Sequence, residues 1–211
     1  MDANAILTSI WALGGLPTQA LDWVDLSGAD PVLPSSFAVG TAAQTSIAAA
    51  ALAACELGHV RGQVRQRVGV DMLHAALECE SWFSVDGHTP DAWDPFSGLY
   101  PCSDGWVRVH ANFAHHRDGA LALLGLSSTT AQRKDVEHAL RSWKAQDFEQ
   151  AAADRGLVAS ALRSFAQWDV HPHAQAIAAQ ALLTLERIGD APPLALPTLG
   201  ADQLPLTGLR V

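Results

Sequence analysis

Five polar residues that could bind a ligand occur close together in the middle of the chain. They are His110, Asn112, His115, His116 and Arg117. The sequence predicts a strand-to-helix junction there, and such junctions can present side chains to a pocket. Arg117 carries a permanent positive charge and would be the main anion-binding group. We therefore predict that these five residues line a polar substrate-binding pocket; the alternative is that they are exposed or helix-capping side chains.

Metal binding is a less favoured interpretation of the same histidines. A metal site needs three or four converging ligands. His115 and His116 are adjacent, so on a helix their side chains would point about 100° apart. Glycine-rich phosphate loops and the Gly-x-Ser-x-Gly elbow are also missing from the sequence. We expect neither a bound metal nor a tightly bound cofactor.

The composition indicates a folded protein that does not bind nucleic acid or anionic membranes. The 211 residues are 49% hydrophobic and 17% charged, which is enough to bury a core. The net charge is -9, and no Lys or Arg precedes Arg61. Nucleic acids and anionic membranes both need clustered cations, and targeting peptides begin with positive charge. We therefore expect a cytoplasmic protein, with its three cysteines reduced.

An uncharged, alanine-rich stretch from Phe37 to Cys55 predicts a long buried helix. Polar residues such as Thr41 and Gln44 make it too polar for a membrane span. The spacing of Thr41 and Gln44 is also that of a capping box at the start of the helix. Gly58 would then end it.

The rest of the chain alternates between helix and strand signals, which predicts a mixed α/β (α+β) fold. Asp71 is expected to cap a helix that runs to Phe83, and Pro172 to begin another. Strands are predicted over 68–70, 106–110, 157–160 and 182–188, and a helix from Asn112 to Leu124. The predicted regions are 1–85 (N-terminal segment and helical part of a large domain), 86–190 (small α/β domain) and 191–211 (Pro-rich tail leading into a strand).

Three stretches together resemble the family III CoA-transferases. Residues 66–76, which begin Gln-Arg-Val-Gly-Val-Asp, are similar to the family's Gly-Gln-x-Val-x-Val motif and the helix after it. Residues 93–108 resemble its entry to a small domain, where a Tyr precedes an Asp-Gly turn and a strand. Residues 168–172 resemble its later Glu-Ala-x-x-Asp-Pro region. Over about residues 37–190, the resemblance implies part of the family III fold, in which a Rossmann-like domain and a small α/β domain form interlocked dimers.

The resemblance implies transfer of coenzyme A between an acyl-CoA and a carboxylic acid, or racemisation of an acyl-CoA. In the transferases, an Asp at the start of the alanine-rich helix attacks the thioester and later carries CoA as an aspartyl thioester. Counting back from Gln66 places Thr41 at that position, and Glu56 is the only carboxylate between Asp30 and Asp71. We therefore expect the isolated chain to have no catalytic residue and no activity. The resemblance implies that the substrate of the complete enzyme is a CoA thioester.

Residues 205–211, Pro-Leu-Thr-Gly-Leu-Arg-Val, resemble the opening of a family member. This predicts that the chain is the leading half of a longer enzyme, whose second half or homodimer partner supplies the chemistry. The alternative is a non-catalytic pseudoenzyme subunit or scaffold that pairs with a catalytic half. An autonomous hydrolase or metal enzyme built on the histidines is a third hypothesis.

Overall fold

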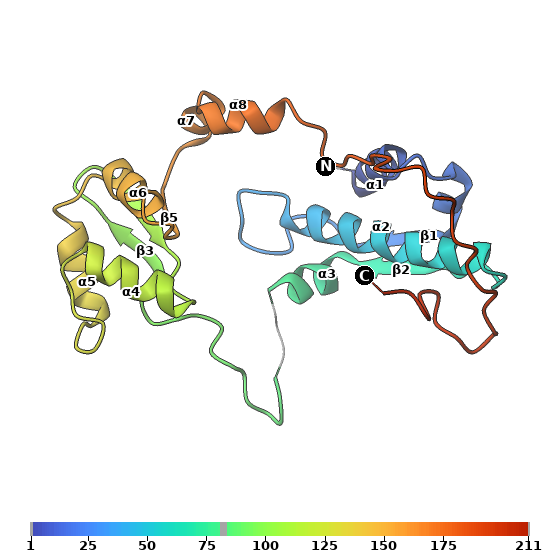
Figure 1. Ribbon diagram of the computed structural model, residues 1–211, viewed down its shortest axis with the longest axis horizontal. Helices are drawn as coiled ribbons and strands as arrows, with labels where there is room; N and C mark the ends of the chain where they lie inside the picture. Colours follow the sequence, from blue (N-terminus) through green and yellow to red (C-terminus); the bar gives the residue numbers. More distant parts are fainter. Residues whose placement is uncertain (1, 81–83, 211) are drawn as a thin grey trace. The chain divides into compact units, whose positions relative to one another are not determined.

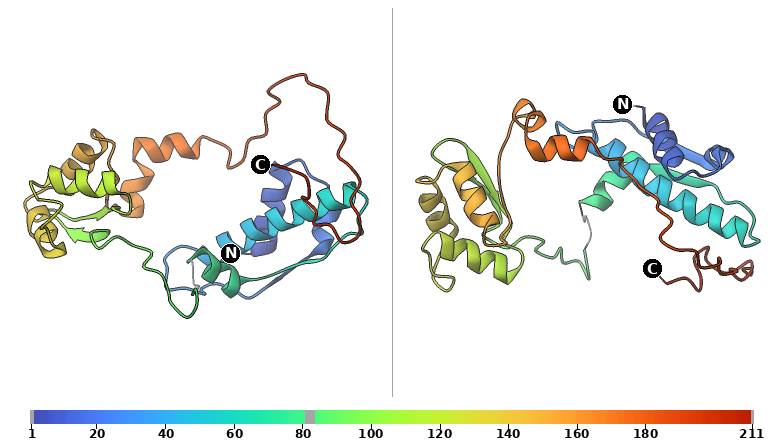
Figure 2. Two further views of the ribbon diagram at one scale, coloured as in Figure 1. Left: turned by 60° about the horizontal axis from the view of Figure 1, so that its bottom comes forward. Right: turned by 45° about the horizontal axis from the view of Figure 1, so that its top comes forward.

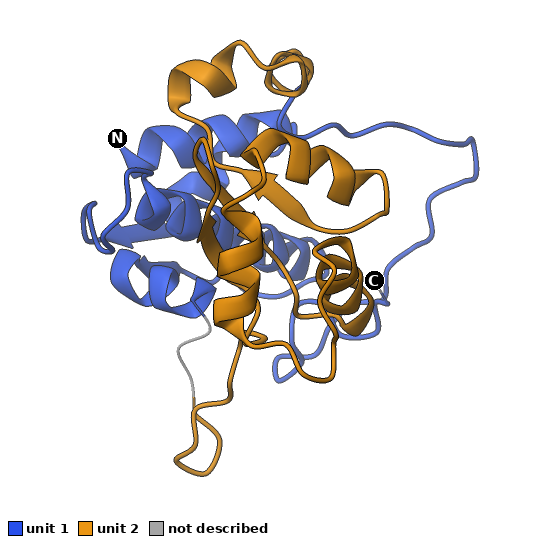
Figure 3. Ribbon diagram, turned by 90° about the vertical axis from the view of Figure 1, so that its left-hand side faces the viewer, with its two compact units in different colours: residues 1–83, 181–211 blue, residues 84–180 orange. Residues whose placement is uncertain are grey.

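The computed structural model describes residues 2–80 and 84–210, and it divides into two compact units (Figure 1). Unit 1 comprises residues 1–83 and 181–211, and unit 2 comprises residues 84–180 (Figure 3). The chain leaves unit 1 two residues before the expected boundary and returns to it before residue 190. The Pro-rich tail packs as part of unit 1.

Unit 1 is built around a β-α-β arrangement. Strands β1 (Val24–Ser27) and β2 (Val68–Asp71) pair in parallel, with Val24 opposite Val68 and Ser27 opposite Asp71. Parallel strands need a long crossover, which α2 (Val39–Val60) provides. The unit also contains α1 (Ala3–Leu13), the 3-10 helix η1 (Thr18–Trp23) and α3 (Met72–Cys79). The carboxyl ends of both strands therefore meet the start of α2 at one edge.

The core of unit 1 lies between α1, α2 and the two strands. Trp11, Ala20, Leu52 and Val68 form its buried cluster. The indole N–H of Trp11 donates to the carbonyl of Pro17 at 2.9 Å, so the buried ring keeps a polar partner. None of the helices in the described part of the chain is long and apolar enough to cross a membrane.

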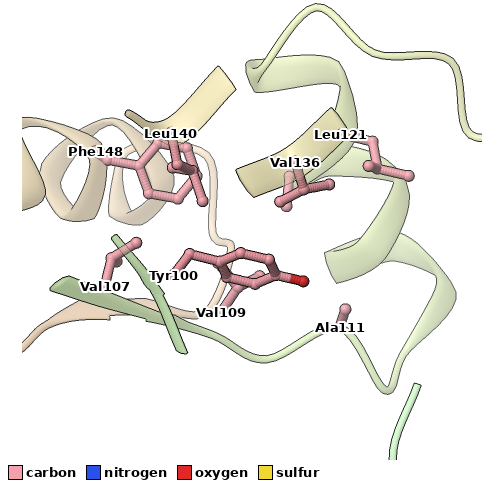
Figure 4. Close-up of a cluster of buried hydrophobic side chains, with 9 residues drawn as sticks. Tyr100, Val107, Val109, Ala111, Leu121, Val136, Leu140 and Phe148 are labelled. Carbon is pink, nitrogen blue, oxygen red and sulfur yellow. The ribbon is translucent and has the colours of Figure 1, made fainter. Parts of the chain in front are cut away.

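Unit 2 contains an antiparallel sheet in the order β3-β4-β5, formed by β3 (Gly98–Pro101), β4 (Trp106–Val109) and β5 (Ala159–Ala161). Along β4 exposed and buried residues alternate, with Val107 and Val109 on the buried face. That face is covered by α4 (Ala114–Leu123), α5 (Arg133–Leu140) and α6 (Ala145–Ala153) (Figure 2). Figure 4 shows the resulting core around Tyr100, Leu121, Val136, Leu140 and Phe148.

Two short helices, α7 (Phe165–Asp169) and α8 (Pro172–Ala178), follow β5.

The mixed α/β fold class is confirmed, as are strand β2, the Asp71 cap of α3 and Pro172 at the first position of α8. The strand predicted over 182–188 is wrong, because these residues are exposed and pair with no sheet edge. Residues 205–208 form turns without a strand, and Val211 lies outside the described residues, as do 81–83 at the end of the helix predicted to reach Phe83.

Candidate functional site

The carboxyl ends of β1 and β2 form a polar edge at the start of α2. The Gln44 side chain, 1% exposed, reaches this edge from α2. Its Nε2 donates to the carbonyls of Ser27 at 2.7 Å and Val70 at 2.8 Å, so it joins both strand ends. Ser27 Oγ donates to Asp71 Oδ2 at 3.0 Å. In open α/β sheets ligands bind at the carboxyl edge, which makes this polar edge a candidate site.

Asp30 also lies at the polar edge, although the sequence predicts no role for it there. Its Oδ2 accepts hydrogen bonds from the Thr41 main-chain N–H at 2.9 Å and from Thr41 Oγ at 2.5 Å. Its Oδ1 accepts one from Gly40 N–H at 3.2 Å. The bond from the Thr41 hydroxyl is the main reason that the pKa of Asp30 is lowered. A carboxylate therefore lies beside Thr41 after all, although it comes from a preceding loop rather than from α2.

The capping box predicted for Thr41 and Gln44 is wrong, because α2 begins earlier, at Val39. Its N-cap residue, Ala38, has no side chain that could cap, and Asp30 binds the free N–H groups instead. A carboxylate at this end is also favoured by the helix dipole. Gly40 permits the approach, since a Cβ there would lie 2.5 Å from Asp30 Oδ1. The contacts of Asp30 are those of a helix cap.

Asp71 is the second carboxylate of the polar edge. Its Oδ1 accepts hydrogen bonds from the N–H groups of Leu73 at 3.0 Å and His74 at 3.1 Å, at the start of α3. The bond from His74 N–H is the largest reason that the pKa of Asp71 is lowered. Both carboxylates are therefore ionised at neutral pH and hydrogen-bonded to helix starts. Among the described side chains, Gln44 Oε1 is buried at this edge without a hydrogen-bond partner.

Three of the five residues predicted to line a pocket gather around Phe113, just before α4. The ring centroid of Phe113 lies 6.1 Å from that of His110, 6.0 Å from His115 and 5.9 Å from His116. The rings of His115 and His116 are only 4.0 Å apart, so the expectation that they diverge is wrong. Burial, and then the proximity of His115 and His110, lower the pKa of His116, which favours its neutral form.

Asn112 and Arg117, the other two predicted residues, both contact the loop that contains Asp94. Asn112 Oδ1 accepts hydrogen bonds from Asp94 N–H at 3.0 Å and Ser97 Oγ at 2.7 Å. The predicted cap by Asn112 is therefore wrong, and Phe113 is the N-cap of α4. Arg117 pairs with Asp118 at 2.8 Å and with Asp94 at 3.7 Å. Two carboxylates thus balance the charge that was expected to bind an anion; substrate binding by the five residues stays a prediction.

An open cavity of about 320 Å³ lies at the opposite end of α2 from the polar edge. It is lined by residues of the α2–β2 connection and by two residues of the tail: Gly62, Gln63, Val64, Arg65, Gln66, Leu199 and Ala201. Arg65 makes a two-pronged ion pair with Glu56, at 2.9 and 3.0 Å, so its charge is balanced. In residues 2–80 and 84–210, no three His, Cys, Asp or Glu side chains are grouped to hold a metal ion.

The chain is similar to solved structures of the hypothetical protein Rv3272 from Mycobacterium tuberculosis. Three of these, one of them a mutant, align with TM-scores of 0.53, 0.54 and 0.56, each at 18% identity. The alignments cover 90–96% of this chain but 56–60% of those chains, so the chain spans less than two-thirds of their length. A CAIB/BAIF family protein from Brucella suis aligns at 16% identity over 79% of this chain and 50% of its own, but a TM-score of 0.44 is too low to establish a shared fold.

No protein-family model matches the sequence, and no curated protein matches it. The identity to Rv3272 is too low to carry over an activity, because one fold can support many chemistries. The comparisons therefore establish that the chain has the fold of the corresponding part of Rv3272.

Proposed function

We propose that this chain is part of a family III CoA-transferase-like enzyme, which moves CoA between an acyl-CoA and a carboxylic acid or racemises an acyl-CoA. One observation carries the proposal: motif residues 66–76 span β2 and the start of α3 directly after the alanine-rich helix α2, and these elements meet at the polar edge. Ligands of open α/β sheets bind at such an edge. A second resembling stretch, residues 93–108, agrees with this: its Asp104-Gly105 turn lies between β3 and β4, where the resemblance implies a turn followed by a strand.

In this proposal the chain supplies binding surface and no nucleophile. Thr41 stands at the expected nucleophile position, and its hydroxyl donates to Asp30. The Asp30 carboxylate accepts three hydrogen bonds, which stabilise its ionised form and leave it less reactive towards a thioester. The nucleophilic carboxylate would therefore come from a second half or a dimer partner.

A non-catalytic pseudoenzyme subunit is the second candidate function. The observation in its favour is that both carboxylates of the polar edge cap helices. The two proposals differ in whether this chain binds the CoA thioester or only a partner protein.

The test measures acyl-CoA binding by calorimetry and CoA transfer by chromatography, using short-chain acyl-CoA thioesters with free carboxylic acids. We expect binding without transfer, and no covalent adduct in the intact mass. Transfer by the isolated chain, or a hydroxylamine-sensitive adduct on Asp30 that Asp30→Asn removes, would overturn the missing-nucleophile argument. Failure of every thioester to bind would instead favour the pseudoenzyme subunit.

The predicted pocket in unit 2 is tested by Arg117→Ala. If it binds the CoA thioester, the variant weakens acyl-CoA binding several-fold. Arg141→Ala is the matched control, because Arg141 makes an exposed ion pair with Glu137 in the same unit. Equal affinity in both variants would exclude Arg117 from the binding surface.

A further inference from the structure

The Arg61 side chain donates hydrogen bonds to three main-chain oxygens of the C-terminal tail. The residue is 4% exposed and lies directly after the last turn of α2. Its Nε donates to the carbonyl of Pro197 at 3.1 Å, and its two terminal nitrogens donate to the carbonyls of Pro205 and Thr207, each at 2.9 Å. These acceptors follow Arg61 by more than 130 residues in the sequence. We call residues 197–209 the strap.

The surface under the strap is shaped to receive it. The N–H of Leu199 donates to the Arg61 carbonyl at 2.9 Å. Gln63 Nε2 donates to the carbonyls of Gly200 at 3.1 Å and Gln203 at 2.6 Å. Gly62 allows close approach, since a Cβ there would lie 2.9 Å from the Thr198 methyl group. The strap therefore docks on a specific seat, formed by the end of α2 and the connection to β2.

Apart from these hydrogen bonds the strap has few packing contacts: Pro205 and Leu209 are half-buried, and Pro205 lies close to Gly58. Within residues 197–209, Leu199 is the buried residue, at 8% exposed. Residues 181–196, which connect unit 2 to the strap, are all exposed and form neither helix nor strand. Among the described ion pairs none involves Arg61, so its guanidinium is hydrogen-bonded by neutral strap carbonyls, and water can replace them if the strap leaves. Segments with few buried apolar contacts open locally at low free-energy cost.

We propose that residues 197–209 form a detachable strap, that the Arg61 guanidinium is its latch, and that docking of the strap completes the cavity beside Gln66. Leu199 and Ala201 form one wall of that cavity, and residues 62–66 form the other. When the strap leaves, the cavity loses its first wall. Through the strap, the tail contacts the connection between α2 and β2, which leads into the 66–76 motif. This proposal does not depend on whether the chain acts on CoA thioesters.

The experiment follows hydrogen exchange by mass spectrometry on the full chain, comparing the wild type with Arg61→Ala. In the wild type, we expect the strap to exchange at least tenfold more slowly than residues 181–196. In Arg61→Ala the strap should exchange as fast as that linker, residues 62–66 should exchange faster, and the middle of α2 should be unchanged. Arg67→Ala is the matched control: it removes a nearby arginine that pairs with Asp25 and does not line the cavity, and strap exchange should stay within twofold of the wild type.

Unchanged strap exchange in Arg61→Ala would overturn the proposal. If that variant instead loses protection throughout unit 1, Leu199→Asp decides, because the substitution lies on the strap and leaves the seat intact. Fast exchange confined to the strap and residues 62–66 supports a detachable strap. Loss of protection throughout unit 1 in both variants shows that the strap is an inseparable part of the fold, and refutes the proposal.

Discussion

A charged side chain lies at each end of α2, and the two side chains differ in what they connect to the helix. At the start, the Asp30 carboxylate accepts hydrogen bonds from the N–H groups of Gly40 and Thr41, which follow it by 10 and 11 residues. At the end, the Arg61 guanidinium donates to carbonyls of a segment more than 130 residues away. Both charges have the sign that the helix dipole favours. The first end is closed by its neighbouring loop, whereas the second fixes a distant part of the chain.

The two ends of α2 also differ in how much they contribute to the core of unit 1. The start of α2 also contains Gln44, which joins β1 to β2, so changes there should weaken the whole unit. The end of α2 contacts a strap with one buried side chain, so changes there should be felt locally.

Gln44→Ala should be the most damaging substitution. It leaves a void in a buried site and removes the donor shared by the Ser27 and Val70 carbonyls. We expect the free energy of unfolding of unit 1 to fall by about 2–4 kcal/mol. Urea-dependent hydrogen exchange of α2 measures this, with Gln66→Ala as an exposed control. Equal values for the two variants would show that Gln44 does not join the strands energetically.

Gly40→Val should have the next largest effect. A Cβ at this position would lie 2.5 Å from Asp30 Oδ1 and 2.6 Å from the Val32 side chain, so the capping loop must move. Overpacking of this kind costs about 1–3 kcal/mol. The same exchange measurement applies, and Gly69→Ala is the control, because the added Cβ would have no heavy atom within 4 Å beyond its own residue and its chain neighbours. If both variants are equally stable, the close packing of Asp30 against α2 is not required.

Asp30→Asn should change how stability depends on pH. The variant should lose more stability at neutral pH than at low pH. The folded-state pKa of Asp30 is lowered, so its contribution is fully present above the unfolded-state pKa, near 3.9, and is lost as pH falls through the folded-state pKa. The variant should therefore be less stable than the wild type at pH 7, and the difference should shrink in acid. Thermal unfolding from pH 7 to pH 3 measures it; a constant difference would contradict the capping role.

Arg67→Ala should have the smallest effect on the free energy of unfolding. It measures how much a solvent-exposed ion pair contributes to the stability of unit 1. Arg67 pairs with Asp25 at 2.9 Å, but both side chains are more than half exposed. We expect a loss below about 1 kcal/mol that shrinks further in added salt. The same urea-dependent exchange measures this loss. A larger loss would show that an exposed ion pair can stabilise unit 1 without the specific hydrogen-bond geometry found at the ends of α2.

Local patterns predicted much of the fold. The buried helix, strand β2 and the Asp71 cap follow from residues within a few positions of one another. The strand predicted over 182–188 failed because apolar content alone does not provide a sheet edge to pair with. Its residues instead connect unit 2 to the strap.

The candidate site was harder to predict because its contacts are between segments separated in the sequence. Counting positions along the sequence predicts that Thr41 lies at the start of the helix. It does not predict that the carboxylate of Asp30, from the preceding loop, accepts a hydrogen bond from Thr41. Likewise, nothing near Asn112 indicates that its amide would bind the loop at residues 92–97 instead of capping α4. Glycine at position 40 was the available signal, because its missing side chain leaves room for Asp30.

The Arg61 contacts also determine which substitutions the tail can accept. Carbonyl oxygens are common to every amino acid, so Arg61 recognises the path of the tail backbone rather than its side chains. Exposed side chains such as Asp202 and Leu204 make none of these contacts and can change, whereas a substitution that alters the backbone path would displace one or more of the acceptor oxygens. The tail is thus permissive in sequence and strict in conformation, except at Leu199, which is buried, at Gln203, whose Oε1 accepts a hydrogen bond from Gly200 N–H, and at Pro205, which lies close to Gly58.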